Sequence, residues 1–169
     1  MFLLSMFRKA QPQPAMQYSS GGAASGHFEH QTNGSVASMA TQAGNIPSDF
    51  PVDAFLRSAK ISFVRLQAAN DKKDLDDIRE YTTPEMFAEI AMQIRERDDT
   101  PQSTNVLTIT ADLLEVHNED GYAIASVRMR GELSENKGAP EGFDEVWHVQ
   151  KNLRDDQAVW LLAGIQQVE

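Results

Sequence analysis

Apolar residues recur every three or four positions between residues 51 and 96, which is the spacing of helices that bury one face. We predict a first helix over residues 51–69, with Asp49 as its N-cap. A short second helix is predicted over residues 73–81, and a third begins at Pro84 after a cap at Thr82 or Thr83. The side chains predicted to face the core are Val52, Phe55, Leu56, Ala59, Phe63 and Leu66, then Leu75, Ile78 and Tyr81, then Phe87, Ile90, Ala91 and Ile94.

From Val106 onward apolar and polar residues alternate, as in strands with one buried face. Leu107, Ile109 and Ala111 are expected to share a face, and the pair Leu113-Leu114 indicates a bulge. The sequence Asn118-Glu119-Asp120-Gly121 predicts a hairpin turn. The inward residues of the returning strand are predicted to be Ala123, Ala125, Val127, Met129 and Leu133.

The stretch from Phe143 to Gln167 predicts a long closing β-hairpin that carries the only two tryptophans of the chain, Trp147 and Trp160. Its inward faces are predicted to be Phe143, Glu145, Trp147 and Val149 in the first arm and Val159, Leu161, Ala163 and Ile165 in the second. Helices followed by a four-strand meander predict an α+β fold. Its three helices are expected to pack on one face of a curved four-stranded antiparallel sheet.

The first predicted helix has a second stripe on the side opposite its core face. Three apolar residues in this stripe are interleaved with three basic ones: Ile61, Val64 and Ala68 with Arg57, Lys60 and Arg65. A fully solvated face would not need isoleucine and valine. The stripe is therefore either buried by a neighbouring helix or is a dimer contact, a landing site for the N-terminal tail, or a surface for lipid headgroups.

The chain has a formal net charge of -10, and the excess lies in residues 50–169, which hold 13 basic and 23 acidic residues. Such a domain repels phosphate backbones, so nucleic acid is excluded as a partner. The absence of cysteine excludes disulfides, thiol nucleophiles and thiolate metal sites. No cofactor and no metal site are expected, because His27 and His30 have no further ligand nearby.

Residues 1–9 place a seven-residue apolar run before Arg8 and Lys9. The run is too short to span a membrane, but apolar-then-basic is the pattern at the cytoplasmic end of a transmembrane helix. We therefore predict the end of a membrane-anchoring segment, with a longer apolar stretch before Met1; the alternative is a frayed terminus without a role. Residues 10–48 have the composition of a flexible low-complexity linker, and residues 49–169 are predicted to form the folded domain.

Four segments of this domain resemble the Tim44-like domain family: residues 50–90, the strand GYAIASVRMRGEL, then EVWHVQKN, and the terminal WLLAGIQQ. The family comprises the C-terminal domain of the mitochondrial inner-membrane import subunit and its bacterial relatives. The resemblance implies a cone of helices on a curved sheet, similar to nuclear transport factor two, with an apolar groove between them. It also implies a membrane-associated scaffold at the cytoplasmic face of the bacterial inner membrane, connected with protein transport. The N-terminal chaperone- and channel-binding region of the import subunit is missing, so a motor role does not carry over.

Our first functional hypothesis is therefore a non-catalytic scaffold that binds membrane lipid or another hydrophobic ligand, with a protein partner at the inner membrane. The expected groove lining is Phe55, Ala59, Phe63, Phe87, Ile94 and Trp147, and the expected lipid or partner surface is Arg57, Lys60, Ile61, Val64 and Arg65. Because ten surplus acids oppose docking on an anionic bilayer, tethering by the N-terminus is favoured over autonomous binding. The isolated domain is expected to be soluble.

Two alternatives remain open. The first is a cavity enzyme of the isomerase or dehydratase type with Glu145 as acid or base, which Tyr81 or His148 could join. Alternation directs His148 to the other side of the sheet, and no second catalytic group is placed by spacing, so a structural hydrogen bond is favoured for Glu145. The second is a homodimer formed through the open sheet face or through Ile61 and Val64.

Overall fold

A computed structural model describes residues 45–168 of the chain. Its elements are the helices α1 (Val52–Lys72), α2 (Leu75–Glu80) and α3 (Pro84–Glu96) and the strands β1 (Thr104–Glu119), β2 (Tyr122–Glu135), β3 (Glu141–Asn152) and β4 (Leu161–Gln167). The predictions for the anchoring segment, for the linker up to residue 44 and for His27 and His30 lie outside the described residues.

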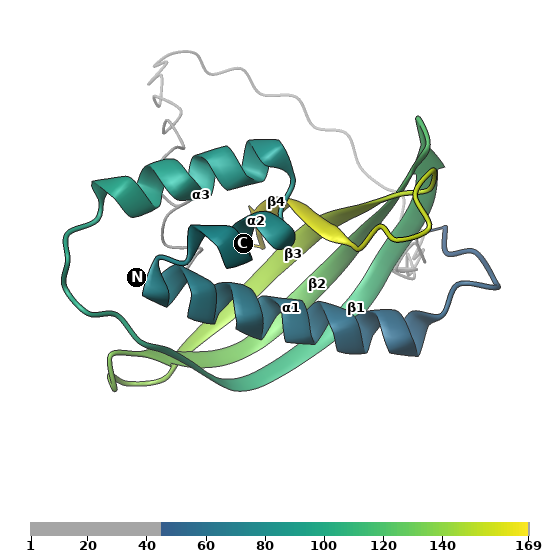
Figure 1. Cartoon of the computed structure of the whole chain (residues 1–169). Helices are drawn as coiled ribbons and strands as arrows, with labels where there is room; N and C mark the ends of the chain where they lie inside the picture. The colour runs from purple at the N-terminus through teal and green to yellow at the C-terminus, as the bar shows by residue number, and fades with distance from the viewer. Residues whose placement is uncertain (1–44, 169) are drawn as a thin grey trace, which may run out of the picture.

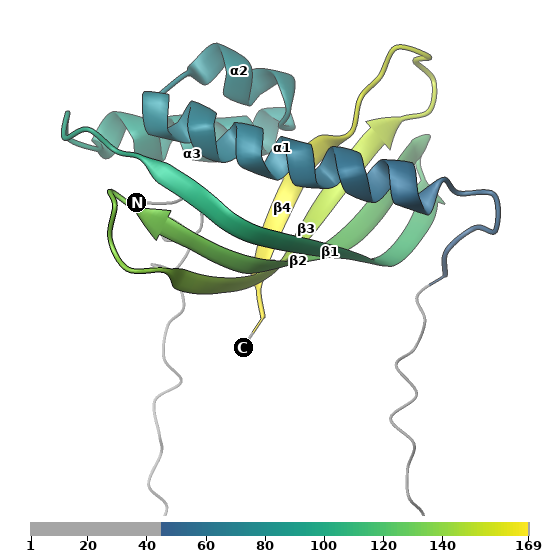
Figure 2. The same ribbon diagram turned by 90° about the horizontal axis from the view of Figure 1, so that it is seen from below.

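The four strands form one antiparallel sheet in the order β1-β2-β3-β4. All three helices lie on the same face of this curved sheet, with α1 crossing it lengthwise (Figures 1 and 2). The outer edge of β4 is partly covered by the segment between α2 and α3, because Leu162 donates its N–H to the Tyr81 carbonyl oxygen and accepts from the N–H of Thr83. The predicted α+β class, with three helices on a four-stranded antiparallel sheet, is confirmed.

Helix α1 buries the predicted face, with Phe55, Phe63 and Leu66 in the core. The predicted N-cap at Asp49 is wrong. The first helical bond runs from the Phe55 N–H to the Pro51 carbonyl oxygen at 3.0 Å, so Pro51 occupies the cap position and no side chain caps the helix. Asp49 lies two residues too early, since a capping side chain must reach the second or third helical N–H.

Short polar side chains set the limits of the next two helices. The Asp74 carboxylate accepts the N–H of Asp77 and caps α2, and the Thr83 hydroxyl accepts the N–H of Met86 and caps α3 just before Pro84. The predicted threonine cap is thereby assigned to Thr83. Ile78, Ile90, Ala91 and Ile94 are buried as predicted, whereas Phe87 is only half-buried.

Two bulges shape β1, one between Val106 and Thr108 and one between Leu113 and Glu115. The second is the predicted bulge. The first turns Leu107 outward, so the prediction that Leu107 shares a face with Ile109 and Ala111 is wrong. The bulge also brings the β1 backbone onto β2, where a Cβ on Gly131 would lie 2.0 Å from the Thr108 carbonyl oxygen.

The closing hairpin matches its prediction in β3 and departs from it in β4. Phe143, Glu145, Trp147 and Val149 are all buried. In β4, Gly164 pairs with His148 and Leu162 with Val149, so Ala163 between them has no partner and forms a bulge. This extra residue shifts the alternation, and the core-facing residues are Leu162 and Ile165. The predicted inward positions of Val159, Leu161 and Ala163 are therefore wrong.

Candidate functional site

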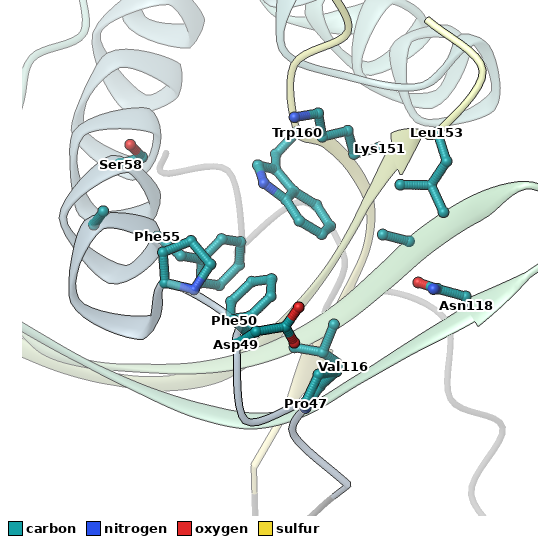
Figure 3. A pocket seen from close by; sticks show the side chains of 13 residues that line it. Pro47, Asp49, Phe50, Phe55, Ser58, Val116, Asn118, Lys151, Leu153 and Trp160 are labelled. Carbon is teal, nitrogen blue, oxygen red and sulfur yellow. The ribbon is translucent and has the colours of Figure 1, made fainter. Parts of the chain in front are cut away.

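One end of the cone is open, where the start of α1 meets the ends of β1, β2 and β3 and the segment before β4. A cavity of about 480 Å³ occupies this end, and we call it the mouth cavity (Figure 3). Its lining comes from three distant parts of the chain: Pro47, Asp49, Phe50, Pro51, Ala54, Phe55 and Ser58; Val116, Asn118 and Ala123; Lys151, Leu153 and Trp160.

Three aromatic rings form the inner end of the mouth cavity. Phe55 and Trp160 meet edge to face with ring centroids 5.0 Å apart, and Phe50 lies 5.2 Å from Phe55 and 6.2 Å from Trp160 in the same edge-to-face manner. Such geometry is favourable for aromatic pairs and holds the rings in fixed positions. The cavity therefore offers a firm apolar wall that does not have to be formed when a ligand enters.

Behind this wall a second cavity of only about 30 Å³, the inner cavity, lies between α1 and the sheet. A space of this size is comparable to the volume that one water molecule occupies. Trp147 lines this cavity, and on its other side Phe63 is fully buried, with its ring 5.2 Å from that of Trp147 and 4.9 Å from that of Phe143. The interior of the cone is thus mostly filled by the protein's own side chains.

Of the six residues predicted to line an apolar groove, the structure brings three together at one cavity. Phe55 lines both cavities, and Ala59 and Trp147 line the inner one. Phe63 and Ile94 belong to the closed core and border neither cavity. Phe87 lies under the Arg79 guanidinium, 4.4 Å from its ring centroid, also away from both cavities. Phe50, Trp160 and Lys151 of the mouth cavity were missed, although the rarity of tryptophan could have drawn attention to Trp160.

Glu145 is fully buried on β3, and its Oε1 accepts the Trp147 indole N–H at 2.5 Å. The predicted structural hydrogen bond is confirmed, while Oε2 has no hydrogen-bond partner. Burial raises the pKa of Glu145 to about 8, and the hydrogen bond from Trp147 only partly opposes this shift. The carboxyl group is therefore protonated at neutral pH.

The groups proposed to join Glu145 in an active site do not do so. Glu145 borders neither cavity. His148 lies on the opposite face of the sheet, where its Nδ1 is 3.0 Å from the Ser126 hydroxyl. Tyr81 borders the inner cavity, and the guanidinium of Arg65 covers its ring at 4.6 Å. Among residues 45–168, neither His148 nor Tyr81 is therefore placed to act with Glu145 as an acid–base pair beside the mouth cavity.

The second stripe of α1 forms a shallow exposed surface with Ile109 of β1, which we call the α1 surface: Arg57, Lys60, Ile61, Val64, Arg65, Ala68 and Ile109. The side chain of Ile61 is 67% exposed and that of Val64 is 45% exposed, so no helix among residues 45–168 buries them. Arg65 donates to Asp77 at 2.6 Å and holds the pKa of that carboxyl below its usual range. No hydrogen bond or ion pair within the described part of the chain engages Arg57 or Lys60.

Among residues 45–168, no helix combines the length and apolar character required to cross a bilayer. Nor do three or more histidine, aspartate or glutamate side chains of this region gather closely enough to hold a metal ion.

Comparison with known proteins relates the chain to one family. The family model described as Tim44-like domain matches residues 36–167. Curated proteins give no match. Among solved structures, a protein of the nuclear transport factor 2 (NTF2-like) superfamily from Salmonella enterica serovar Typhimurium LT2 is 9% identical, with a TM-score of 0.40 over 69% of this chain and 92% of its own. A candidate dehydratase of the NTF2-like family from Streptomyces avermitilis is 13% identical, with a TM-score of 0.36 over 70% of this chain and 99% of its own.

Proposed function

The chain belongs to the Tim44-like domain family, and from this premise we propose that it is a non-catalytic, membrane-associated scaffold that binds a lipid or another apolar ligand in its mouth cavity. The observation that carries this proposal is the aromatic wall of Phe50, Phe55 and Trp160 beside an open space of about 480 Å³. Cavities of 300–1,000 Å³ with mostly apolar walls and a few polar groups are typical of small-molecule sites. Of the predicted groove residues, Phe55 borders this space directly, and Ala59 and Trp147 lie behind it.

A catalytic role has less support. An acid or base must come within about 3 Å of the proton that it transfers, directly or through one water. Glu145 has a raised pKa but lies outside both cavities. The hydrogen bond of its side chain is formed with the Trp147 indole N–H. We therefore assign Glu145 to the core and not to a reaction.

The ligand proposal predicts that full-length protein purified under non-denaturing conditions carries an amphipathic small molecule, detected by native mass spectrometry. Ala54 is exposed and borders the mouth cavity, so Ala54→Trp should fill the space without removing any core contact. We expect this variant to lose the bound molecule while its thermal midpoint stays equal to that of wild-type protein from which the ligand has been removed. Met92→Trp, at an exposed position of α3 outside the cavity, is the matched control and should keep the ligand. Retention of the ligand by Ala54→Trp would refute the proposed site.

We further propose that the N-terminal segment holds the domain at the cytoplasmic face of the inner membrane and that the α1 surface contacts lipid or a protein partner there. Support comes from the apolar-then-basic pattern of residues 1–9 and from the exposure of Ile61 and Val64. A homodimer through the same two residues is the second candidate, because their exposed apolar surface could equally be covered by a second copy.

Membrane fractionation of the full chain separates these roles. Leu3→Ser combined with Leu4→Ser should move the protein from the membrane fraction to the supernatant. Ile61→Ser combined with Val64→Ser should weaken the contact of the α1 surface with the membrane or a partner and leave the N-terminal tether intact. If the wild type elutes as a dimer by light scattering and only the Ile61 and Val64 variant is monomeric, the surface is a dimer contact. If the tail variant stays fully in the membrane fraction, the tether hypothesis is wrong.

A further inference from the structure

The volume of the mouth cavity and the closure behind it limit the shape of a ligand. The mouth cavity holds about 480 Å³, but the inner cavity behind Phe55 and Trp160 holds only about 30 Å³. Both residues border both cavities, so their rings stand between the open space and the core. An apolar chain can lie against these rings but cannot continue into the cone. A lipid with two long chains would therefore leave most of its apolar surface in water, whereas a single short chain or ring system fits.

The polar residues of the mouth cavity limit the headgroup. Asp49 and Lys151 are its two charged lining residues, and within residues 45–168 neither makes an ion pair or a side-chain hydrogen bond. They come from different walls: Asp49 from the segment before α1 and Lys151 from β3 (Figure 3). A ligand with one net charge would be attracted by one of these groups and repelled by the other.

The surroundings of the cavity argue against an anionic headgroup in particular. At this end Glu119 is the last residue of β1 and Asp120 follows it in the β1–β2 turn, and Asp155 and Asp156 lie in the β3–β4 connection. The Arg154 side chain joins the two segments by donating to the Asp120 carbonyl oxygen at 3.2 Å. Within a chain of net charge -10, this acidic end repels anions that carry no compensating positive charge.

We propose that the mouth cavity binds a single-chain amphiphile with a zwitterionic headgroup, its apolar part against Phe50, Phe55 and Trp160, its anionic group at Lys151 and its cationic group at Asp49. This inference rests on the proposed ligand-binding function and specifies the class of ligand. Asn118 and Ser58 also line the cavity and supply neutral hydrogen-bonding groups.

The test is isothermal titration calorimetry of the full chain with four dodecyl compounds, each below its critical micelle concentration: dodecylphosphocholine, dodecyl phosphate, dodecyltrimethylammonium and dodecyl maltoside. The tail is constant, so differences in affinity report the headgroup. We expect dodecylphosphocholine, the zwitterion, to bind tightest.

Lys151→Gln should weaken binding of this zwitterion about tenfold, the effect of losing one charged contact. Asp49→Asn should weaken binding of the trimethylammonium compound and strengthen binding of the phosphate. Lys137→Gln and Glu89→Gln remove one positive and one negative charge at exposed positions away from the mouth cavity and should leave all four affinities unchanged.

The outcomes separate this inference from the function on which it rests. Equal affinity for all four compounds, unaffected by Lys151→Gln and Asp49→Asn, would overturn the zwitterionic headgroup and leave an apolar binding site standing. Vesicles of a two-chain phosphatidylcholine that saturate the site and are blocked by Ala54→Trp would overturn the single-chain limit. If none of the four compounds binds and the vesicles do not bind either, the proposed ligand-binding function itself fails.

Discussion

Replacing Glu145 by glutamine is expected to remove most of the decrease in the free energy of unfolding that we predict for the wild-type protein between about pH 4.5 and pH 8. The buried carboxyl has a pKa of about 8 in the folded protein, against 4.5 in the unfolded chain. Folded protein therefore holds a proton that the unfolded chain has released throughout this interval. Stability falls wherever the folded state binds more protons than the unfolded state, so the contribution of Glu145 is complete below pH 4.5 and is lost as the pH rises to about 8.

The expected loss in the wild type is about 3–5 kcal/mol, because each unit of pKa difference corresponds to roughly 1.4 kcal/mol. Glutamine cannot ionise, and its amide oxygen can still accept the Trp147 indole N–H. Its NH₂ group takes the place of the unpartnered Oε2, which costs about 1–3 kcal/mol at every pH. The variant should therefore be less stable than the wild type near pH 5 and as stable or more stable near pH 8.

Urea denaturation at pH 5, 6, 7 and 8, followed by tryptophan fluorescence, measures this difference. Glu132→Gln on the exposed face of β2 is the control and should leave the wild-type pH dependence in place. Among residues 45–168, the charge of Asp144 also raises the pKa of Glu145, by less than burial does, so Asp144→Asn should move the transition a little toward lower pH. A pH dependence in Glu145→Gln equal to that of the wild type would show that the carboxyl is hydrated or paired in the folded protein.

Replacing Phe63 by alanine is expected to lower the free energy of unfolding by about 3–5 kcal/mol, the range measured for removal of fully buried aromatic side chains. Phe63 is completely inaccessible and stacks against Phe143 at an interplanar angle of 16°. It also contacts Trp147 with ring centroids 5.2 Å apart, so its loss would leave a void at the junction of α1 and β3. For a domain of this size such a loss is a large part of the total stability.

Ile61→Ala is the matched control, since Ile61 lies on the same helix with 67% of its side chain exposed. Its stability should change by no more than about 0.5 kcal/mol. Both variants are compared by denaturant unfolding at one pH. If Phe63→Ala kept wild-type stability but bound the dodecyl compounds more weakly, Phe63 would line a ligand site, as expected for the groove that the family resemblance implies, and it would not belong to a closed core.

Most of the fold could be predicted from local pattern. The three-to-four-residue spacing before residue 96 and the alternation after residue 104 determine which backbone conformation can bury one apolar face, and Pro84 with Thr83 marks a helix start without tertiary information. The burial of Glu145 beside Trp147 also followed from alternation. The inward face of β4 did not, because the bulge at Ala163 depends on how the strand must bend to pair with β3, and nothing in its own sequence marks the extra residue.

The sequence by itself determined the class of fold, the order of its elements and the two faces of α1, because these depend on periods of a few residues along one segment. Only the tertiary structure decided where open space remains. Phe63 fills the interior, whereas Phe50, Trp160 and Lys151 surround a cavity at its end. This cavity is the space that remains between side chains from segments that are distant in the chain. Its position therefore cannot be predicted from the sequence of any one of those segments.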